Sequence, residues 1–274
     1  MTAGDIPAAT SAILADDWGD RRTWFEFVVA HPSCSAVVAE IDGEIVGTGV
    51  TTVNGPVAWI GTIWVASGWR RGGLGTALTA ATIEAADAAR ARTLLLVATE
   101  TGRPLYERVG FEIQTWYVTL EAGGLGSGPE PVIGHPRLRA FDTADLASMA
   151  MLDRAATGED RASLLSAFAT AESARVLRGG DGGIDGFVVR APWGGGATIA
   201  PAAVDALTIL QARRVAAGPG RRVRAGLLAE NADGLALLAA HGWTEAWRAP
   251  RLIHGDPLDW RPTHIWGQFN HALG

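Results

Sequence analysis

Residues 64–111 constrain the fold of this chain more strongly than any other part of it. An apolar run that ends at Val65 leads into the glycine-rich turn 67–75, and an alanine-rich segment with helical periodicity follows. A strand that feeds such a turn and then a helix points several unpaired backbone N–H groups, and the positive end of the helix dipole, into the turn. The sequence therefore predicts an anion-binding site here, with phosphate as the favoured ligand.

Size and composition limit the class of protein. A length of 274 residues is too long for one typical domain and sufficient for two, and 48% apolar residues provide a core for each. The net charge of −6 argues against nucleic acid as a partner. No apolar run reaches the roughly 18–20 residues of a membrane span, and no signal peptide is recognised. We therefore expect a cytoplasmic protein that does not use a membrane.

The basic residues and the cysteine exclude further chemistry. All 23 basic residues are arginines, which excludes mechanisms built on a lysine, such as a Schiff base. Cys34 is the single cysteine, so neither an intramolecular disulfide nor a cysteine metal cluster can form. We expect Cys34 to be a partly buried, unreactive thiol, and the sequence predicts no metal site.

Hydrophobic periodicity divides the first half into alternating elements. Before the turn we expect two helices and then three strands, at 4–17, 21–30, 35–41, 44–53 and 57–65. The pairs Asp42-Gly43 and Asn54-Gly55 favour hairpins between these strands. After the turn, the expected order is helix, strand, helix, strand, at 73–92, 93–98, 103–109 and 111–120. This order is typical of an α/β fold of the α+β sandwich type, with a mixed central sheet flanked by helices.

Glycine and proline separate the two halves of the chain. Residues 121–136 carry both at a density that excludes a helix or a strand. We therefore expect a first domain at 1–122, a linker at 123–136, and a second domain with a C-terminal tail at 137–274. In the second domain the expected elements are at 142–154, 161–171, 183–189, 197–200, 202–217, 223–229, 232–240 and 243–253.

One segment of the second half repeats the first. The pattern Thr99-x-x-Gly102-x-x-Leu105-Tyr106-x-x-x-Gly110-Phe111 matches Asn231-x-x-Gly234-x-x-Leu237-Leu238-x-x-x-Gly242-Trp243 at a constant offset. We interpret the chain as two divergent copies of one fold.

The turn and the segment after it resemble a known family. Arg70-x-x-Gly73-x-Gly75, placed after a strand and at the start of a helix, is similar to the pyrophosphate-binding motif of the GNAT acetyltransferases. Residues 105–111 resemble the late helix and strand of that family, and the resemblance covers residues 4–120 in order and spacing. It implies acetyl-coenzyme A as cosubstrate, held by Ile63, Trp64, Val65, Arg70, Arg71, Gly72, Gly73, Leu74, Gly75 and Thr76.

The chemistry of the turn agrees with that resemblance. Its glycines let the backbone approach phosphate closely, the N–H groups of residues 73–76 point at it, and Arg70 or Arg71 adds a charge-assisted contact. The alternative is an ordinary tight turn with two solvated arginines. A dinucleotide-binding fold is disfavoured, because the turn lacks the third small residue and no acidic residue ends the next strand.

The resemblance also assigns catalytic roles. The family's tyrosine, which protonates the departing thiolate of coenzyme A, corresponds to Tyr106. The strand before the turn is expected to splay from its neighbour, so that Ile63 to Val65 pair with the pantetheine arm. That strand, 57–65, has no acidic residue, so the family's commonest general-base position is empty. Glu100, two residues after the next strand, is either the base or a solvated loop residue.

The candidates for acceptor binding lie in loops and in the tail. Asp17, with Asp16 and Asp20 beside it, stands between the first two helices, where it could attract a cationic amine. Asp153 and Arg161 flank a glycine turn in the loop that covers the acceptor site in this fold, and they either contact the substrate or form a salt bridge. The tail 260–274 is rich in aromatic and polar residues. We expect it to dock against a domain and hypothesise that it lines the acceptor pocket.

The second copy has lost the coenzyme apparatus. Its sequence Ile199-Ala200-Pro201-Ala202-Ala203-Val204 offers neither the arginine nor the glycines of the turn, and Leu238 replaces the tyrosine. The arrangement resembles tandem GNAT proteins in which one copy catalyses and a degenerate copy shapes the acceptor pocket. In addition, only four residues precede Asp5, so the family's first strand is missing or another segment replaces it.

Two functions from different classes follow. The leading prediction is an acetyl-coenzyme A-dependent N-acetyltransferase that moves the acetyl group to the amine of a small molecule or peptide by direct transfer in a ternary complex. The alternative is a non-catalytic module that binds acyl-coenzyme A as a sensor. The sequence identifies neither the acceptor nor the acyl chain length, and it leaves open a homodimer.

Overall fold

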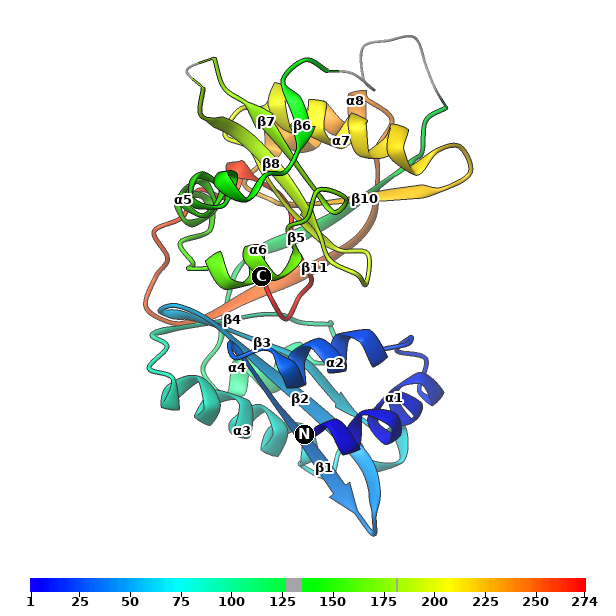
Figure 1. Ribbon diagram of the computed structural model, residues 1–274. Helices are drawn as coiled ribbons and strands as arrows, with labels where there is room; N and C mark the ends of the chain where they lie inside the picture. Colours follow the sequence, from blue (N-terminus) through cyan, green and yellow to red (C-terminus); the bar gives the residue numbers. More distant parts are fainter. Residues whose placement is uncertain (127–134, 181) are drawn as a thin grey trace. The chain divides into compact units, whose positions relative to one another are not determined.

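The computed structural model describes residues 1–126, 135–180 and 182–274, and these form two compact units (Figure 1). Unit 1 consists of Met1–Gln114, Arg251–Pro257 and His271–Gly274. Unit 2 consists of Thr115–Pro250 and Leu258–Asn270. The central part of the predicted linker, 127–134, lies outside the described residues.

Unit 1 holds the elements of the first copy, in the predicted order. Its helices are α1 (Ile6–Ala15), α2 (Arg22–Ala30), α3 (Leu74–Ala88) and α4 (Arg103–Arg108), with 3-10 turns η1 (Ala3–Asp5) and η2 (Ser67–Trp69). Its strands are β1 (Cys34–Ile41), β2 (Glu44–Asn54), β3 (Val57–Val65) and β4 (Thr93–Val97). The helix predicted at 73–92 ends at Ala88, because the backbone is left-handed at Arg90 (φ 61°).

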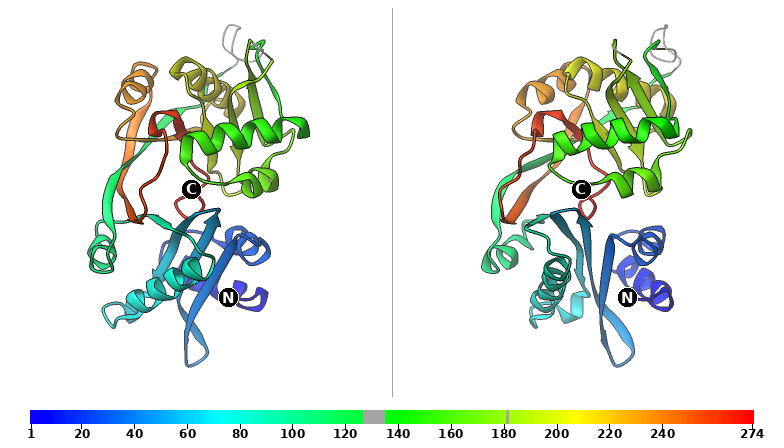
Figure 2. Two further views of the ribbon diagram at one scale, coloured as in Figure 1. Left: turned by 90° about the vertical axis from the view of Figure 1, so that its left-hand side faces the viewer. Right: turned by 60° about the vertical axis from the view of Figure 1, so that its left-hand side comes forward.

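The sheet of unit 1 combines two hairpins and one parallel pair. β1 pairs antiparallel with β2, and β2 with β3, which confirms both hairpin predictions. At the first turn Asp42 and Gly43 both have positive φ (52° and 81°), as a type I′ turn requires. β3 then pairs parallel with β4 across the α3 crossover. Helix α3 covers one face of this sheet, and α1 and α2 cover the other (Figure 2).

Among the described residues, no strand precedes α1. The amino group of Met1 donates one hydrogen bond to the carbonyl of Ala36 in the edge strand β1 (2.8 Å). Thr2 and Asp5 form a capping box, in which the Thr2 N–H donates to the Asp5 carboxylate (2.6 Å). The hydrogen bond between Met1 and Ala36 is therefore the contact found at the edge of β1, where the family's first strand was expected.

Unit 2 holds the elements of the second half. Its helices are α5 (Leu146–Thr157), α6 (Ala162–Phe168), α7 (Ala203–Ala217) and α8 (Ala232–Ala240), with η3 (Thr143–Asp145) and η4 (Pro262–His264). Its strands are β6 (Leu138–Ala140), β7 (Ala174–Arg178), β8 (Ile184–Arg190), β9 (Gly196–Ile199), β10 (Arg222–Leu228) and β12 (Ile265–Gly267). The sequence did not predict β6, β7 and β12, because such short strands carry too little alternation to be recognised.

Two long strands pass from one unit into the other. β5 (Glu112–Gly123) begins in unit 1 and continues into unit 2, where it pairs antiparallel with β10. β11 (Thr244–Gly255) runs the other way, and its last residues pair antiparallel with β4 in unit 1, from Arg251 opposite Val97 to Gly255 opposite Thr93. The strand orders of the two sheets are β1-β2-β3-β4-β11-β5-β10 and β12-β9-β8-β7-β6. Each copy thus completes its sheet with a strand from the other.

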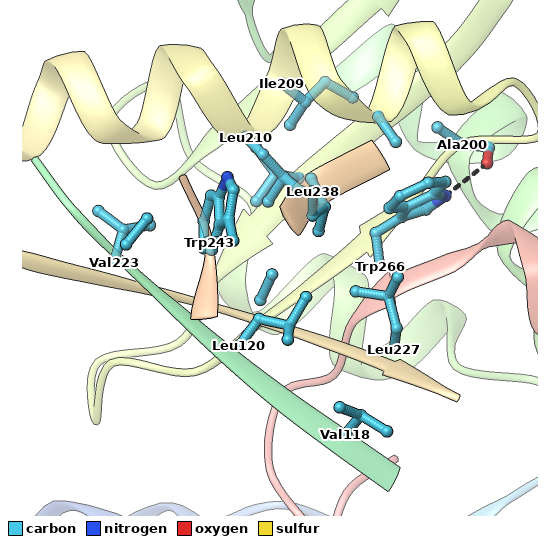
Figure 3. Packing of buried hydrophobic residues seen from close by; sticks show 14 of the residues in the cluster. Val118, Leu120, Ala200, Ile209, Leu210, Val223, Leu227, Leu238, Trp243 and Trp266 are labelled. Carbon is cyan, nitrogen blue, oxygen red and sulfur yellow. Dashed lines mark hydrogen bonds between the residues drawn. The ribbon is translucent and has the colours of Figure 1, made fainter. Parts of the chain in front are cut away.

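Each unit has its own hydrophobic core. The cluster in unit 1 includes Ala58, Ile60, Ala86, Leu94, Leu96, Ala98, Phe111 and Leu252. The cluster in unit 2 lies between α7, α8, β5 and β10, and it includes Val118, Leu120, Ile209, Leu210, Val223, Leu227, Leu238, Trp243 and Trp266 (Figure 3). The tail therefore docks, as expected, since Trp266 is only 1% exposed in this second core.

The predicted repeat has the same hydrogen bonds in both copies. Thr99 Oγ1 accepts from the Gly102 N–H (3.1 Å), and Asn231 Oδ1 accepts from the Gly234 N–H (3.0 Å). At the other end of the short helix, the N–H groups of Phe111 and Trp243 donate to the carbonyls of Tyr106 and Leu238, both at 3.1 Å. These paired bonds confirm that the chain contains two copies of one fold.

Candidate functional site

The glycine-rich turn joins β3 to α3 through an alternating backbone. Arg70 is extended (ψ 157°), Arg71 is left-handed (φ 66°), and Gly73, the N-cap of α3, is left-handed again (φ 88°). The first N–H groups of a helix have no partner within it, and we call residues 70–73 the nest, because anion-binding turns at helix starts have a similar backbone with φ of alternating sign. In the described part of the chain, a Cβ built on Gly73 meets no atom within 4 Å, and one on Gly72 meets only the Trp69 carbonyl oxygen, at 3.7 Å. The space above the nest is therefore open to a ligand.

Gly75 has a different task from the other glycines of the turn. A Cβ built there would lie 3.2 Å from Leu105 Cδ1 and 3.8 Å from Val65 Cγ2. The missing side chain thus lets α4 pack closely against the start of α3. Tyr106, the predicted proton donor, is the next residue of the same helix.

The strand β3 carries a bulge before the turn. Thr48 of β2 lies opposite Trp64, whereas Val50 lies opposite Gly61, so β3 has one extra residue between these pairs. Thr62 is left-handed at this point (φ 52°), which is unusual for a β-branched residue. A bulge of this kind turns the following strand away from its earlier course.

Two neighbouring elements hold the bulge in place. The indole N–H of Trp24, on α2, donates to Thr62 Oγ1 (3.0 Å). The hydroxyl of Thr48, on β2, donates to the carbonyl of Thr62 (2.8 Å). Strained backbone persists where the surroundings determine it in this way, and it is often found at functional sites.

Beyond the third pair, β3 and β4 separate. Their partners run from Val57 opposite Thr93 to Trp59 opposite Leu95, although β3 continues to Val65 and β4 to Val97. In the described structure, residues 60–65 have no partner in β4. The predicted splay is therefore present, and it exposes a backbone edge that leads directly to the nest.

Asp16 ties the end of α1 to the turn. Its carboxylate accepts from the Trp64 indole N–H (2.9 Å) and forms an ion pair with Arg70. The Nε of Arg70 also donates to the carbonyl of Val65 (2.9 Å). In contrast, Arg71 is exposed and has no ion-pair or hydrogen-bond partner among the described residues. The two arginines that the sequence left undecided are thus distinguished, since Arg70 shapes the turn and Arg71 has its charge available.

Tyr106 lies on α4 at the edge of the unit 1 core. Its ring packs edge-on against Phe111, with centroids 6.1 Å apart, and burial raises the pKa of its phenol to about 12. None of the described residues forms a hydrogen bond with its hydroxyl group. The phenol therefore stays protonated at neutral pH, as a proton donor must.

The other acidic candidates lie on the surface. Glu100 is 66% exposed and forms an ion pair with Arg103 (3.5 Å). Asp17 is exposed on a left-handed backbone (φ 61°), and it is the neighbouring Asp16 that contacts the turn. No sequence pattern singled out Thr62 or Trp24 for the site, and Asp16 was grouped with the loop acids beside Asp17, because a bulge and a shared carboxylate depend on partners distant in the chain.

Asp153 and Arg161 form the salt bridge that the sequence offered as one alternative. The guanidinium of Arg161 binds the carboxylate through two bonds, with Nε to Oδ2 at 2.9 Å and the second nitrogen to Oδ1 at 2.5 Å. Both side chains are almost completely buried, and Arg161 also lies over the ring of Phe269 at 5.5 Å. This geometry is that of a staple between α5 and α6 inside unit 2.

The corresponding positions of the second copy have other neighbours than those of the first. Helix α7 follows β9 as α3 follows β3. Its N-cap is Ala202, which has an extended backbone (φ −97°, ψ 130°), whereas the N-cap of α3 is the left-handed Gly73. β12 pairs with β9 at Ile199 and Thr198, on the strand that corresponds to β3. Trp266 of β12 donates its indole N–H to the carbonyl of Ala200 (3.0 Å) and packs beside Leu238, the counterpart of Tyr106 (Figure 3).

Comparison with known proteins identifies the class. A model of the acetyltransferase (GNAT) family matches residues 7–111, and a model of an acetyltransferase (GNAT) domain matches residues 149–267. No curated protein matches the sequence. The chain belongs to the GNAT N-acetyltransferase family and has two GNAT domains in tandem.

Solved structures show the same fold along the whole chain. A protein from Pyrococcus horikoshii, described as a candidate acetyltransferase, is 21% identical with a TM-score of 0.84, over 100% of this chain and 94% of that one. A tandem GNAT protein from the clavulanic acid biosynthesis pathway is 18% identical with a TM-score of 0.60, over 94% of this chain and 98% of that one. GNAT enzymes use acyl-coenzyme A and acetylate amines.

Within the described residues, no helix of this chain has the length and apolar character needed to cross a membrane.

Proposed function

We propose that the protein is an N-acetyltransferase that transfers the acetyl group of acetyl-coenzyme A to a primary amine, and that unit 1 holds the active centre. The observation that carries the proposal is the combination of three features in unit 1: the open turn at Gly72 and Gly73, the edge of β3 at 60–65 without a partner in β4, and the protonated phenol of Tyr106. Phosphate groups suit the nest, and the amide-rich pantetheine arm suits a free strand edge.

In this proposal the chain contributes binding, orientation and one proton. The nest and Arg71 hold the diphosphate, and the edge of β3 aligns the arm by backbone hydrogen bonds. The amine nitrogen attacks the thioester carbonyl carbon, the new C–N bond forms, and the C–S bond breaks; the nitrogen releases one proton to solvent, which later restores the proton that Tyr106 gives up. Tyr106 donates its proton to the departing sulfur, because a phenol with a pKa of about 12 is protonated throughout the physiological range.

Removal of a proton from the acceptor amine does not require a carboxylate base on β3. An ammonium group that enters a site lined by buried protein loses hydration, which lowers its pKa and favours the neutral amine that attacks. Glu100 is 66% exposed and paired with Arg103, so the proposal does not depend on it as the base. The variant Glu100→Gln tests whether Glu100 is the base, and Tyr106→Phe, assayed in parallel, tests the proton donor. Unchanged turnover in Glu100→Gln would agree with proton loss to solvent.

We further propose that the second copy binds no coenzyme. Its β9 edge is paired with β12, whereas the corresponding edge of β3 is open. Leu238 is completely buried in the unit 2 core, in the position equivalent to Tyr106. A strand and a packed leucine therefore occupy the places that the first copy leaves for ligand and proton donor.

The proposal is tested by coenzyme binding and thiol release. Calorimetry with acetyl-coenzyme A should give one site per chain, and release of free coenzyme A should depend on an added amine from a panel of amines, amino acids and peptides. Gly73→Asp places a side chain on a left-handed residue and a negative charge in the nest, so binding should be lost. Binding without amine-dependent thiol release would instead favour a sensor of acyl-coenzyme A.

A further inference from the structure

The last four residues of the chain, His271–Gly274, belong to unit 1, although the residues before them belong to unit 2. Ala272 and Leu273 are 5% and 0% exposed. The side-chain amide of Asn54, at the end of β2, donates to the carbonyl of Leu273 (2.9 Å), and this bond is buried. The tail end is therefore a fixed part of unit 1.

The tail end touches β3 at Gly61. A Cβ built on Gly61 would lie 2.4 Å from Ala272 Cβ, 2.9 Å from Ala272 Cα and 3.1 Å from the His271 carbonyl oxygen. These distances leave no room for a side chain. Gly61 directly precedes the left-handed Thr62, so the tail meets β3 at the start of its bulge.

This contact lies where the reacting group would be under the proposed function. The arm starts at the nest and runs back along β3 from Val65 toward Gly61, a distance of about 13 Å for four residues of extended strand. Gly61 is two residues from Trp59 and so shares its face of the sheet, opposite the face on which Ala58 and Ile60 pack toward the core with Ala86 of α3. The tail thus contacts the sheet face opposite α3, at Gly61, on the side that α1 and α2 also cover (Figure 2).

We infer that His271–Gly274 forms the acceptor-side boundary of the active centre and that the contact between Ala272 and Gly61 sets the size of the amine that reaches the thioester. This inference rests on the proposed function. The side chains of the segment are a methyl group, a buried leucine and a buried imidazole, and burial lowers the pKa of His271 to about 4, so none of these side chains is charged at neutral pH. A neutral, close-packed boundary excludes water and admits only an amine that fits.

Three variants test the boundary. Gly61→Ala displaces the tail through the contact with Ala272, and Asn54→Ala releases it through the lost bond to Leu273, from a residue that lies on β2 and not on β3. Ala272→Gly removes one methyl group from the boundary and leaves the tail in place. In the double variant Gly61→Ala with Ala272→Gly, the 2.4 Å contact is absent, so the effect of Gly61→Ala should be partly reversed.

The measurements are thiol release from acetyl-coenzyme A with water alone and with methylamine, ethylamine, propylamine and butylamine. We expect the two displacing variants to raise hydrolysis without amine at least fivefold, and Ala272→Gly to shift the preferred amine to a longer one. For Asn54→Ala and Ala272→Gly, which lie outside the strand edge assigned to the arm, coenzyme affinity by calorimetry should stay within twofold of wild type. NMR titration of the histidines shows whether the tail is displaced. The pKa of His271 should be about 4 while the tail is in place and near its ordinary value of 6.5 once the tail is displaced.

The outcomes separate this inference from the proposed function. If wild type binds no acetyl-coenzyme A, or no amine promotes thiol release, the proposed function fails. If turnover is normal and His271 reports a displaced tail, yet hydrolysis and amine preference are unchanged, only the boundary is refuted. The same holds if neither Gly61→Ala nor Asn54→Ala alters the His271 titration in a folded protein, as judged by circular dichroism.

Discussion

The indole N–H of Trp24 donates a hydrogen bond to the hydroxyl of Thr62, 38 residues further along the chain, at 3.0 Å. Thr62 is the left-handed residue of the β3 bulge, and the bulge precedes the part of β3 that has left β4. A side chain on α2 therefore helps to determine the shape of the strand edge to which the coenzyme arm is assigned.

Removing this bond should loosen the bulge. We expect Trp24→Phe to lower the free energy of unfolding by about 1–2 kcal/mol, because a hydrogen bond and part of a buried ring are lost. Turnover should fall further than coenzyme affinity, because the strand edge is less well placed. Denaturant unfolding and steady-state kinetics measure both. Trp247→Phe, at a 42% exposed tryptophan, is the control and should change stability by less than about 0.5 kcal/mol.

The two arginines of the turn should respond differently to substitution. We expect Arg71→Ala to weaken acetyl-coenzyme A about tenfold, because a charge-assisted contact is worth roughly 1.5 kcal/mol, and to reduce the salt dependence of binding. Arg90→Ala, at the other end of α3 and also left-handed, removes the same charge and should change affinity less than twofold. Equal effects at the two positions would argue against a contact between Arg71 and phosphate.

Arg70 is expected to act through the turn. Its side chain bonds Asp16 and the Val65 carbonyl, so Arg70→Ala should weaken coenzyme binding and also lower the thermal midpoint of unfolding. Asp16→Asn keeps the shape but removes the ion pair, and it should lower stability with a smaller effect on binding. Calorimetry combined with thermal unfolding distinguishes the two residues. A loss of binding at full stability in Arg70→Ala would assign Arg70 directly to the ligand.

The proton donor should show itself in the rate and its pH dependence. Tyr106→Phe is expected to lower kcat by about 100-fold with unchanged coenzyme affinity. Because burial raises the pKa of Tyr106, the donor form is complete below about pH 11 and is lost only as the pH passes about 12. The wild-type rate should therefore show no fall from this group between pH 7 and 10. The chain's other tyrosine, Tyr117, is buried in unit 2. Tyr117→Phe is therefore the control, and it should not lower kcat as Tyr106→Phe does.

The buried pair Asp153 and Arg161 should matter for stability and not for substrate. Asp153→Asn or Arg161→Met alone leaves an unpaired buried group, so we expect a loss of about 3–5 kcal/mol. Asp153→Leu combined with Arg161→Met should recover most of that loss. Acceptor KM in the double variant decides between a staple and a substrate contact, since a contact would raise KM even when stability is restored.

The sequence predicted features that depend on residues close together in the chain. The hairpin turns, the nest and the short helix at 103–109 each follow from the placement of glycines nearby in the sequence. The repeat that begins at Thr99 and at Asn231 predicted the corresponding short helix in the second copy. It also predicted the splay of β3, although only through the family resemblance. These parts of the fold and site need no distant partner to be recognised.

Features that depend on distant partners could not be predicted. The bulge at Thr62 needs Trp24 and Thr48, the role of Asp16 needs Trp64, and Gly61 is explained only by Ala272. The exchange of β5 and β11 is equally invisible, because a strand looks the same in sequence whichever sheet it joins. β12 was too short to detect, yet it closes the edge of β9.

The exchanged strands also dictate when the molecule can become native during synthesis. As the first copy leaves the ribosome it lacks both the strand that borders β4, residues 251–255, and the tail that covers Gly61. Its sheet stays incomplete until almost the whole chain has been made, so the catalytic copy reaches its native form late, together with the second copy. We expect a gene fragment encoding only the first copy to yield protein with an exposed β4 edge that is prone to aggregate.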